Sequence, residues 1–379
     1  MRLLLVTPDF PPDFGGTQTY AFELARRLRS LCDDFAVMAP KRAGSATLDA
    51  KLPFDVIRLR ASGDAFAIAA LWRMYRLRRR FDTSLHVLWP SALAALANRM
   101  LGWRGQVFVA AHARELLIDP APGRPLRALY NLIRRAAITR ADGVFPVSRY
   151  TAELLGTLGA RQDRITVVSN GTDPAHFCPN GRATPTDLSG LKGPVVLTVS
   201  RLTSRKGIDT VIRALPDVVR AVPDVSYVIA GSGPDEERLR QLAAEIGVAD
   251  CVHFAGSVAY ELLPDYYNAC DVFAMPALEL SPDVEGFGIV FLEANACAKP
   301  VVGARSGGIP DAIRHEETGL LVEPGDAKST SDALIRLLTD HELAVRLGRQ
   351  GRERVLAEAT WDHAADQLFG AMRSTSEVS

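Results

Sequence analysis

The sequence lacks the marks of several protein classes. None of its five cysteines forms a Cys-x-x-Cys pair, so neither a zinc site nor a disulfide framework is indicated. Residues 83–98 form the longest stretch without a formal charge, and they contain a histidine and a proline. That stretch is shorter than the roughly 20 apolar residues of a membrane-spanning helix. No secretory signal or low-complexity segment is recognisable, so the sequence predicts a globular protein of a reducing cytoplasm.

The net charge of zero conceals an uneven distribution. Residues 1–180 hold 25 Lys and Arg against 15 Asp and Glu, a net charge of +10, whereas residues 181–379 hold 19 against 29, a net charge of −10. A basic half joined to an acidic half suggests two different partners. The alternative is that charge merely differs between two domains of unrelated origin.

Short apolar runs alternate with helical patterns, and the series restarts after a linker. Alternation of this kind indicates parallel sheets with helices on both faces. The stretch 171–194 is rich in Gly and Pro and is typical of a linker. The predicted strands are residues 2–6, 34–39, 54–59, 84–89, 106–111, 143–148 and 165–171, and then 194–202, 226–233, 251–257, 271–276, 299–305 and 319–324.

The pattern therefore predicts two doubly wound, Rossmann-like α/β domains in tandem, at residues 1–178 and 190–361. Ligands of such sheets bind outside the carboxyl ends of the strands. A last helical segment follows the second domain, at about residues 362–379, and its periodicity does not decide on which domain it packs.

The segment Ser-Arg-Leu-Thr-Ser-Arg-Lys-Gly, residues 200–207, follows a predicted strand and opens a helix. Arg201 offers a planar fork for phosphate oxygens and Lys206 a compact charge. The helix start adds backbone N–H groups and a partial positive charge. Together these features predict an anion site suited to a diphosphate, although the alternative is two solvated surface cations.

A second segment, residues 283–300, combines carboxylates with glycines. Glu285 precedes a Gly-Phe-Gly turn, and Glu293 follows about two helical turns later, so both could point to similar sides. A carboxylate beside a phosphate site can accept hydrogen bonds from sugar hydroxyls. The alternatives are a helix cap for Glu285 and a surface position for Glu293, and a short acidic metal motif at 283–285 is not favoured.

Two features of the first half also lie where strands are predicted to end. His112 follows the strand 106–111, a position that makes it a stronger functional candidate than the other histidines. A lone His is nevertheless more often structural. Gly15 and Gly16 follow the first strand and open a helix, where bare backbone lets a ligand come close. The Gly-Ser-Gly-Pro of residues 231–234 lacks the third glycine of a dinucleotide fingerprint and indicates a tight turn.

Two basic amphipathic segments, residues 66–81 and 124–140, suit the surface of an anionic membrane. We favour the simpler interpretation, in which the apolar face packs on the sheet and the arginines are solvated. Nucleic acid is not expected, because aromatic stacking positions are not interleaved with the basic ones. The apolar face of the first segment consists of Ile68, Leu71, Trp72 and Tyr75, and its arginines are Arg73, Arg76, Arg79 and Arg80.

Taken in order, these motifs resemble the retaining glycosyltransferases of family 4, which have the GT-B fold. The resemblance rests on Gly15-Gly16, His112, "SRLTSRKG", "GSGP" and "EGFGIVFLEANACAKPVV", together with "VVSNGTD" before the linker, and it covers nearly the whole chain. It implies two Rossmann-like domains facing a cleft, the first for an acceptor and the second for a nucleotide-diphosphate sugar. It also implies that the final helix crosses back to the first domain.

The resemblance implies roles for residues of the second domain. Arg201 and Lys206 would hold the donor diphosphate, and Glu293 would hold the ribose. Glu285 would contact hydroxyls of the donor sugar, helped by backbone groups of Phe287, Gly288 and Ile289. The backbone around Ser257 and Val258 would meet the base.

In the first domain, the resemblance places His112 near the donor sugar and the reaction centre. Because Arg201 and Lys206 of the second domain suit the diphosphate better, we expect Gly15-Gly16 to close onto the donor phosphate from the first domain. The family often has Gly after this His, where the chain has Ala113, and this departure makes the role of His112 less secure.

We therefore expect a retaining hexosyltransferase that uses a UDP- or GDP-sugar and acts in glycoconjugate or polysaccharide biosynthesis. The basic half suggests an anionic, lipid-linked or saccharide acceptor, and contact with the inner face of a membrane. No cofactor or metal is expected, because Arg201, Lys206 and a helix start can stabilise the leaving diphosphate. The alternatives are a sugar-nucleotide epimerase on the same fold and a non-catalytic protein that binds nucleotide sugars.

Overall fold

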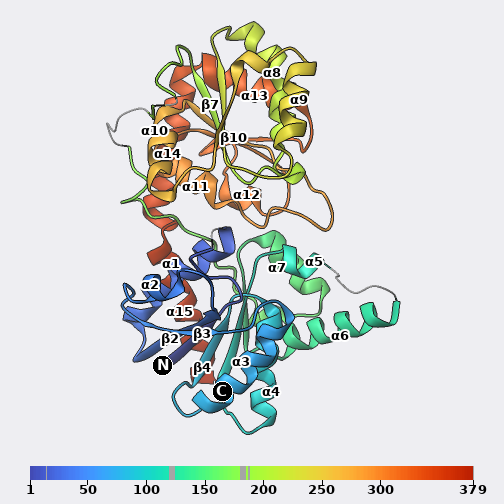
Figure 1. Cartoon of the computed structure of the whole chain (residues 1–379), viewed down its shortest axis with the longest axis vertical. Helices are drawn as coiled ribbons and strands as arrows, with labels where there is room; N and C mark the ends of the chain where they lie inside the picture. Colours follow the sequence, from blue (N-terminus) through green and yellow to red (C-terminus); the bar gives the residue numbers. More distant parts are fainter. Residues whose placement is uncertain (14, 119–123, 180–184, 187, 379) are drawn as a thin grey trace. The chain divides into compact units, whose positions relative to one another are not determined.

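The computed structural model describes the chain except residues 14, 119–123, 180–184, 187 and 379 (Figure 1). Two compact units divide it: unit 1 comprises Met1–Asn170 and Trp361–Ser379, and unit 2 comprises Gly171–Thr360. The division falls earlier than residue 178, the predicted end of the first domain. The last helix belongs to unit 1.

Unit 1 contains a six-stranded sheet with the order β3-β2-β1-β4-β5-β6, in which every pair of neighbouring strands is parallel. The strands are β1 (Arg2–Val6), β2 (Asp34–Pro40), β3 (Asp55–Leu59), β4 (Thr83–His86), β5 (Gln106–Ala111) and β6 (Gly143–Pro146). The helices are α1 (Gly16–Leu31), α2 (Ser45–Asp49), α3 (Asp64–Leu77), α4 (Trp89–Met100), α5 (Arg114–Leu117), α6 (Arg124–Arg140), α7 (Arg149–Thr157) and α15 (Trp361–Val378).

Unit 2 contains a second parallel sheet, with the order β12-β11-β10-β7-β8-β9. Its strands are β7 (Val195–Val199), β8 (Ser226–Ala230), β9 (Val252–Gly256), β10 (Val272–Met275), β11 (Val301–Ala304) and β12 (Gly319–Val322). Its helices are α8 (Ile208–Ala221), α9 (Glu236–Glu245), α10 (Leu263–Ala269), α11 (Ile289–Ala296), α12 (Ile309–Ala312), α13 (Ala327–Thr339) and α14 (His341–Glu358).

Both sheets have the same doubly wound topology. Each series starts in the middle of its sheet, runs to one edge over three strands and returns to the middle for the fourth. The order reverses between β1 and β4 in unit 1 and between β7 and β10 in unit 2, and ligands of such sheets bind at this switch point. The predicted pair of Rossmann-like domains is confirmed.

Buried apolar faces explain the layers. In unit 2, α8 buries Ile208, Val211, Ile212, Leu215 and Val218, whose spacing of three and four residues lines one side of a helix. Full burial of each such side chain contributes about 1.5–3 kcal/mol to the stability of the folded state. In unit 1, α3, α4 and α6 bury apolar side chains in one core with residues of β1, β2, β3, β5 and β6.

Two predicted strands differ from the structure. Residues 165–171 form no strand: Ile165 makes an isolated bridge to Val144, and the rest of the segment is irregular. The strand predicted at 84–89 ends at His86, because α4 starts at Trp89 with a proline in its first turn. The linker predicted at 171–194 lies partly outside the described residues.

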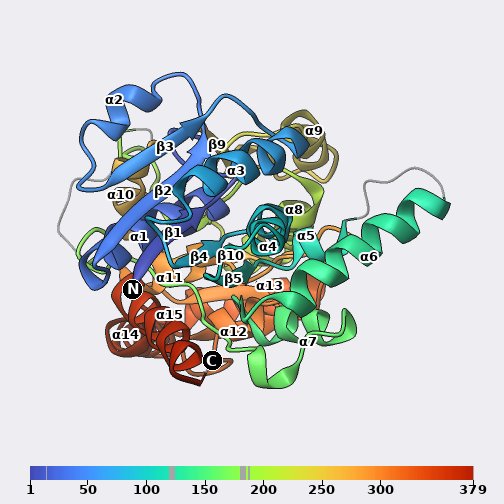
Figure 2. The ribbon, with the colours of Figure 1, turned by 90° about the horizontal axis from the view of Figure 1, so that it is seen from below.

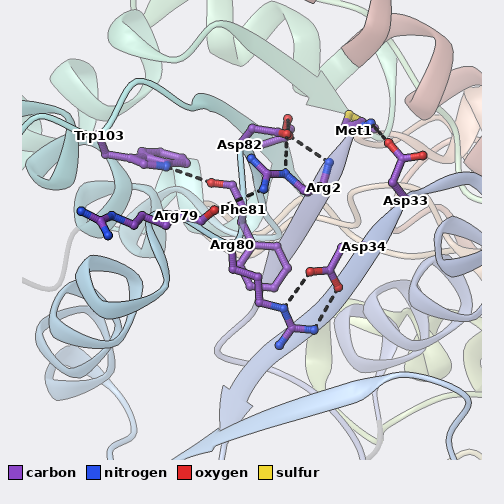
Figure 3. A network of polar contacts seen from close by, with 10 residues as sticks. Met1, Arg2, Asp33, Asp34, Arg79, Arg80, Phe81, Asp82 and Trp103 are labelled. Atoms are coloured by element: carbon purple, nitrogen blue, oxygen red, sulfur yellow. Dashed lines mark hydrogen bonds and ion pairs between the residues drawn. The ribbon is translucent and has the colours of Figure 1, made fainter.

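Ion pairs hold the amino ends of the strands in unit 1 (Figure 3). Arg80 pairs with both carboxylate oxygens of Asp34, Nε–Oδ2 at 2.7 Å and Nη2–Oδ1 at 2.9 Å, and also with Asp55 at 2.9 Å. Arg2 donates from its backbone N–H and Nε to Asp82, at 2.9 and 3.0 Å. The hydrogen bonds that Arg80 donates to Asp34 lower the pKa of the Asp34 carboxyl. Because Asp34, Asp55 and Asp82 start or precede β2, β3 and β4, the network aligns four neighbouring strands.

Candidate functional site

In unit 2, the segments after β7 and β10 lie at the switch point of the sheet. The backbone N–H of Leu278 donates to the carbonyl of Arg205 at 2.7 Å, which joins the two segments. Gly207, at φ 68°, lies where an added Cβ would be 2.0 Å from the carbonyl oxygen of Pro276. The segments therefore come so close that only glycine fits before α8.

Cations and carboxylates gather at this point. Lys206 Nζ lies 2.5 Å from Glu285 Oε2, and the Arg205 guanidinium pairs with the same oxygen. Arg205 Nε also lies 3.2 Å from Asp283 Oδ1. Burial alone would raise the pKa of Glu285, but the charges of Lys206 and Arg205 outweigh it and hold the pKa at about 2. Glu285 is therefore ionised at neutral pH, and its Oε1 lies outside both ion pairs.

Arg201 differs from the other two cations of the loop. Its side chain is exposed, and none of the described residues pairs with its guanidinium. Three cations and two carboxylates leave the cluster with a net charge of about +1 at neutral pH. Arg205 was missed by the sequence analysis, although it stands inside the quoted segment, because no pattern distinguished it from Arg201.

The start of α11 follows the carboxylates directly. Gly288 caps this helix without a side-chain hydrogen bond, and its first turn contains no acidic residue. Phe287 is buried beside this turn. The first N–H groups of a helix have no acceptor within the helix, so they are available to a ligand. The predicted contacts of Phe287, Gly288 and Ile289 with a ligand stay predictions.

Glu293 has surroundings of its own. Its side chain is 6% exposed, and the Tyr267 hydroxyl donates to its Oε2 at 2.7 Å. Burial raises the pKa of Glu293 to about 7. Glu285 precedes α11 and Glu293 lies within it, so the two do not form one stripe on a helix, as their spacing had suggested. The alternative of a surface position for Glu293 is wrong, and Tyr267 carried no sequence signal.

The residues predicted to meet the base lie after β9. Ser257 is exposed, and its hydroxyl hydrogen-bonds to that of Ser232 at 2.8 Å. The Gly231 N–H donates to the Gly256 carbonyl at 2.7 Å, so the "GSGP" turn and the segment before Val258 are joined. The structure thus brings these two motifs together, and their contact with a base stays a prediction.

In unit 1, His112 lies at the carboxyl end of β5. Its ring packs edge-on against Tyr20 of α1, with centroids 4.5 Å apart. The imidazole hydrogen-bonds to the Val87 carbonyl, while Nε2 is buried without a partner. Because a carbonyl can only accept, the proton lies on Nδ1 and Nε2 is an acceptor. Burial lowers the pKa of His112 to about 4, so the ring stays neutral.

The turn after His112 is strained and tightly bonded. Ala113 has φ 78° and ψ −59° and is fully buried. A non-glycine residue in such a conformation costs on the order of 1–3 kcal/mol. The Glu115 carboxylate accepts the His112 N–H at 2.7 Å, and burial raises the pKa of Glu115 to about 7. The chain therefore keeps, with Ala113, a backbone path that glycine would adopt more easily.

The helix start at Gly15-Gly16 has open space around it. An added Cβ on Gly16 would meet nothing within 4 Å, whereas one on Gly15 would meet the Gln18 side chain at 2.6 Å. Packing therefore does not explain the glycine at position 16. Tyr20, four residues further along α1, contacts His112, so the structure brings α1 and the turn after β5 together. A role for Gly16 in ligand approach stays a prediction.

The two basic helices leave apolar side chains in solvent. On α3, Phe66, Ala70 and Met74 form the buried face, while Ile68 and Trp72 are 65% and 67% exposed. The interpretation that Ile68 and Trp72 pack on the sheet is therefore wrong. Their spacing gave the right helix but the wrong face.

On α6, Leu126, Leu129 and Leu132 are 54%, 52% and 64% exposed. The helix extends beyond its neighbours in unit 1 (Figures 1 and 2). Not all of the predicted arginines are solvated: Arg80 is held in the ion pairs described above, and Arg134 is buried. The Arg124 side chain lies outside the described part of the chain.

Within the described ranges, no group of three or more His, Cys, Asp or Glu side chains is placed to hold a metal ion. No helix in the same ranges is long and apolar enough to cross a bilayer. Independence of a metal stays a prediction.

Two doubly wound domains, one with a cationic cluster at its switch point, define the GT-B class of nucleotide-sugar enzymes. The family "Glycosyltransferase Family 4" matches residues 14–176, and "Glycosyl transferases group 1" matches residues 187–354. The chain belongs to glycosyltransferase family 4, and the predicted glycosyltransferase activity and GT-B fold are confirmed. The epimerase and the non-catalytic binding protein are not supported.

Similar proteins extend over the whole chain. A "GDP-mannose-dependent alpha-(1-6)-phosphatidylinositol monomannoside mannosyltransferase" of Mycobacterium tuberculosis is 35% identical, with 98% of each chain covered. An "alpha-maltose-1-phosphate synthase" of Mycolicibacterium smegmatis is 30% identical over 99% of this chain and 100% of its own. A sucrose-phosphate synthase from Thermosynechococcus elongatus has a TM-score of 0.81 at 23% identity and full coverage of both chains, which shows the shared fold.

Proposed function

We propose that the protein transfers mannose from GDP-mannose to a mannosylated phosphatidylinositol lipid. The observation that carries this proposal is full-length similarity to enzymes with that name. Besides the M. tuberculosis protein, a Mycolicibacterium smegmatis protein of the same name is 36% identical over 95% of each chain. A Corynebacterium glutamicum enzyme named for the monoacylated lipid is 33% identical over 98% of each chain.

The cationic cluster of unit 2 suits the donor diphosphate. As the sugar–phosphate bond breaks, negative charge grows on the diphosphate, and positioned cations stabilise it in the transition state. Arg201 is exposed and carries no ion pair, so its guanidinium can turn to phosphate oxygens without losing a partner. Lys206 has three N–H donors, of which Glu285 needs one.

Glu285 suits a sugar hydroxyl rather than a phosphate. Its low pKa keeps it ionised, and Oε1 is outside the two ion pairs that engage Oε2. We assign Oε1 to accept a hydroxyl of the donor hexose. His112 Nε2, a neutral acceptor with no partner, suits a second substrate hydroxyl.

The reaction forms a bond from the acceptor hydroxyl oxygen to the sugar C1 and breaks the bond from C1 to the diphosphate oxygen. The acceptor proton leaves with the diphosphate, and the bonding pair of the broken bond stays on its oxygen. GDP-mannose is α-linked, and the relatives' names specify an α-linked product, so the proposal includes retention of configuration.

Donor choice can be tested by the thermal shift of the full chain with GDP, GDP-mannose, UDP and UDP-glucose. We expect GDP and GDP-mannose to raise Tm, and we expect Arg201→Ala to remove most of that shift. A larger shift with the UDP compounds would overturn the choice of GDP-mannose, and no shift with any of the four would count against the donor site itself.

The exposed apolar side chains of α3 and α6 suit the surface of the membrane that carries such a lipid. Trp72 and Leu129 are large and solvent-exposed, and Arg73, Arg76 and Arg127 are exposed on the same two helices. Cations beside an apolar face favour an anionic bilayer, and each contributes about 1 kcal/mol near the surface. We propose peripheral association at the cytoplasmic face.

Co-sedimentation with vesicles tests this association. We expect binding to vesicles of phosphatidylcholine with phosphatidylinositol, weaker binding to phosphatidylcholine alone, and loss of binding in Leu129→Ser/Leu132→Ser. A matched control is Leu356→Ser, since Leu356 is 53% exposed on α14 of unit 2. Equal binding by wild-type and double variant would contradict the assignment to α6.

A soluble sugar phosphate is a second candidate acceptor. The full-length similarity to an enzyme named for maltose 1-phosphate favours it, and the basic unit 1 suits either acceptor. Initial rates with mannosylated phosphatidylinositol in vesicles and with glucose 1-phosphate in solution separate the two. We expect transfer to the lipid. Preferential transfer to glucose 1-phosphate would make a soluble sugar phosphate the acceptor in place of the lipid.

A further inference from the structure

The turn that presents His112 is bonded at several points. The Glu115 carboxylate reaches back over Ala113 and accepts the His112 backbone N–H at 2.7 Å, and it also accepts its own backbone N–H. The Glu115 carbonyl in turn accepts from the Trp89 indole at 3.1 Å. The side chain and the carbonyl of one residue thus attach the turn to the end of β5 and to α4.

A buried arginine fixes the other end of the same turn. Arg134 of α6 donates from Nη1 to the carbonyl of Leu116 at 2.6 Å, and from Nη2 to Asn131 at 2.6 Å. α5 is thereby attached to α6 as well as to α4. The backbone of the turn cannot shift without breaking one of these bonds, so its strained conformation is imposed by its surroundings.

The strain lies directly beside the functional imidazole. Ala113 follows His112 with φ 78°, and without an external bond this dihedral would relax toward negative φ. Relaxation would turn the peptide that carries His112 and move Nε2, whose position is otherwise set by one hydrogen bond to Val87 and by the Tyr20 ring. The Glu115–His112 bond spans this dihedral.

We propose that Glu115 is a positioning residue: its carboxylate oxygen holds the His112 backbone in the strained turn and so aims Nε2 at the substrate. The proposal rests on the role of His112 given under "Proposed function". It needs a hydrogen-bond acceptor at residue 115, not a negative charge. Glutamine supplies that acceptor in the same place, whereas alanine does not.

The test compares Glu115→Gln, Glu115→Ala, His112→Ala and the double variant Glu115→Ala/His112→Ala as full-length proteins. The readouts are kcat and KM for GDP-mannose, the Kd of GDP and Tm. We expect Glu115→Ala to lower kcat about 10- to 30-fold, with KM and the Kd of GDP within about twofold. We expect Glu115→Gln to keep at least half of the activity, and Tm shows that each variant is folded.

The double variant distinguishes positioning from general destabilisation. If Glu115 acts through His112, adding Glu115→Ala to His112→Ala lowers kcat by less than about twofold, because the imidazole is already absent. A loss of 10-fold or more in both backgrounds would overturn the proposal, as would an unchanged kcat in Glu115→Ala. If His112→Ala itself retains full kcat, the assigned role of His112 fails, which is a different result from either of these.

Discussion

The two edges of the unit 1 sheet treat polar groups in opposite ways. At the amino ends, charged side chains are half-exposed and paired, as in Arg80 with Asp34 and Arg2 with Asp82. At the carboxyl ends, neutral polar atoms are buried and unpaired, namely His112 Nε2 and the Tyr20 hydroxyl. A paired charge in solvent contributes modestly to stability, whereas an unpaired buried atom costs free energy until a ligand satisfies it. The amino edge therefore adds to stability, whereas the carboxyl edge keeps polar atoms for a ligand, as the proposed function requires.

Unit 2 adds a third arrangement at its carboxyl edge. There Lys206 and Arg205 are largely buried and both pair with one oxygen of Glu285. Removing one partner of such a cluster leaves the other uncompensated, which is more costly than the loss of a surface pair. Unit 2 therefore presents charged groups at its carboxyl edge, while unit 1 presents neutral acceptors.

The largest effect is expected for Lys206→Ala. The variant should lower kcat for transfer from GDP-mannose by about 100- to 1,000-fold, because one stabilising donor is lost from the developing diphosphate charge. Steady-state rates and the Kd of GDP measure it. The matched control is Lys328→Ala on α13, an exposed lysine paired with Asp332. A similar loss of kcat in both variants would show that the net charge of the protein, rather than the cluster around Lys206, determines the rate.

Glu293→Gln should raise the free energy of unfolding and weaken the binding of the nucleotide. The folded pKa of Glu293 is raised to about 7, so the folded state retains a proton that the unfolded chain releases near its ordinary pKa of 4.5. This contribution is present at low pH and is lost as pH rises through 7. Removing the carboxyl should therefore increase the free energy of unfolding at pH 8 by up to about 3 kcal/mol.

Urea unfolding at pH 4 and pH 8 checks this, with little change expected at pH 4. The Kd of GDP should rise about tenfold if the carboxylate holds the ribose. A stability gain equal at both pH values would contradict the raised pKa, and an unchanged Kd would remove Glu293 from the nucleotide site.

A pair of buried histidines sharpens the contrast within unit 1. His86 at the end of β4 has both ring nitrogens near hydroxyls, Ser91 and Ser84 at 3.1 Å each, whereas His112 has one nitrogen without a partner. His86→Phe should therefore lower the free energy of unfolding by about 1–3 kcal/mol, because buried hydroxyls lose their partner. His112→Phe should instead lower kcat at least tenfold with little change in Tm. The reverse pattern would exchange the two roles.

The smallest effect is expected at the amino edge. Arg80→Ala should destabilise the chain by about 1 kcal/mol, since the pairs with Asp34 and Asp55 are partly solvent-exposed. The loss should shrink at high salt, and kcat should not change. Urea unfolding in low and high salt, together with initial rates, measures both. A clear loss of kcat would show that the two edges are coupled.

Much of the fold was readable from the sequence because apolar runs in parallel sheets are continuous and stand out. The Arg-Lys loop and the glycine before α8 were also readable, since they follow a strand directly. The buried face of α3 was not readable. Phe66 and Trp72 are both aromatic residues of one amphipathic helix, and only the packing against the sheet decides which of them is buried. Periodicity alone therefore predicted burial of Trp72, which is exposed, in place of Phe66, which is buried.

Partners across loops were also beyond the sequence. Glu285 and Lys206 are 79 positions apart, and nothing in either motif indicates that one oxygen pairs with two cations. Tyr20 and Tyr267 carry no motif, and Glu115 stands among ordinary residues of a short helix. These contacts arise only when the switch point brings distant segments together.

The most direct test of the central claim is the anomeric configuration of the product made from GDP-mannose and a mannosylated phosphatidylinositol in vesicles. Nuclear magnetic resonance of the purified product gives it in one measurement. We predict one added mannose in α linkage, formed by the wild-type chain and formed about 100- to 1,000-fold more slowly by Lys206→Ala. A β-linked product would contradict retention, and the absence of any mannosylated lipid would contradict the proposed reaction.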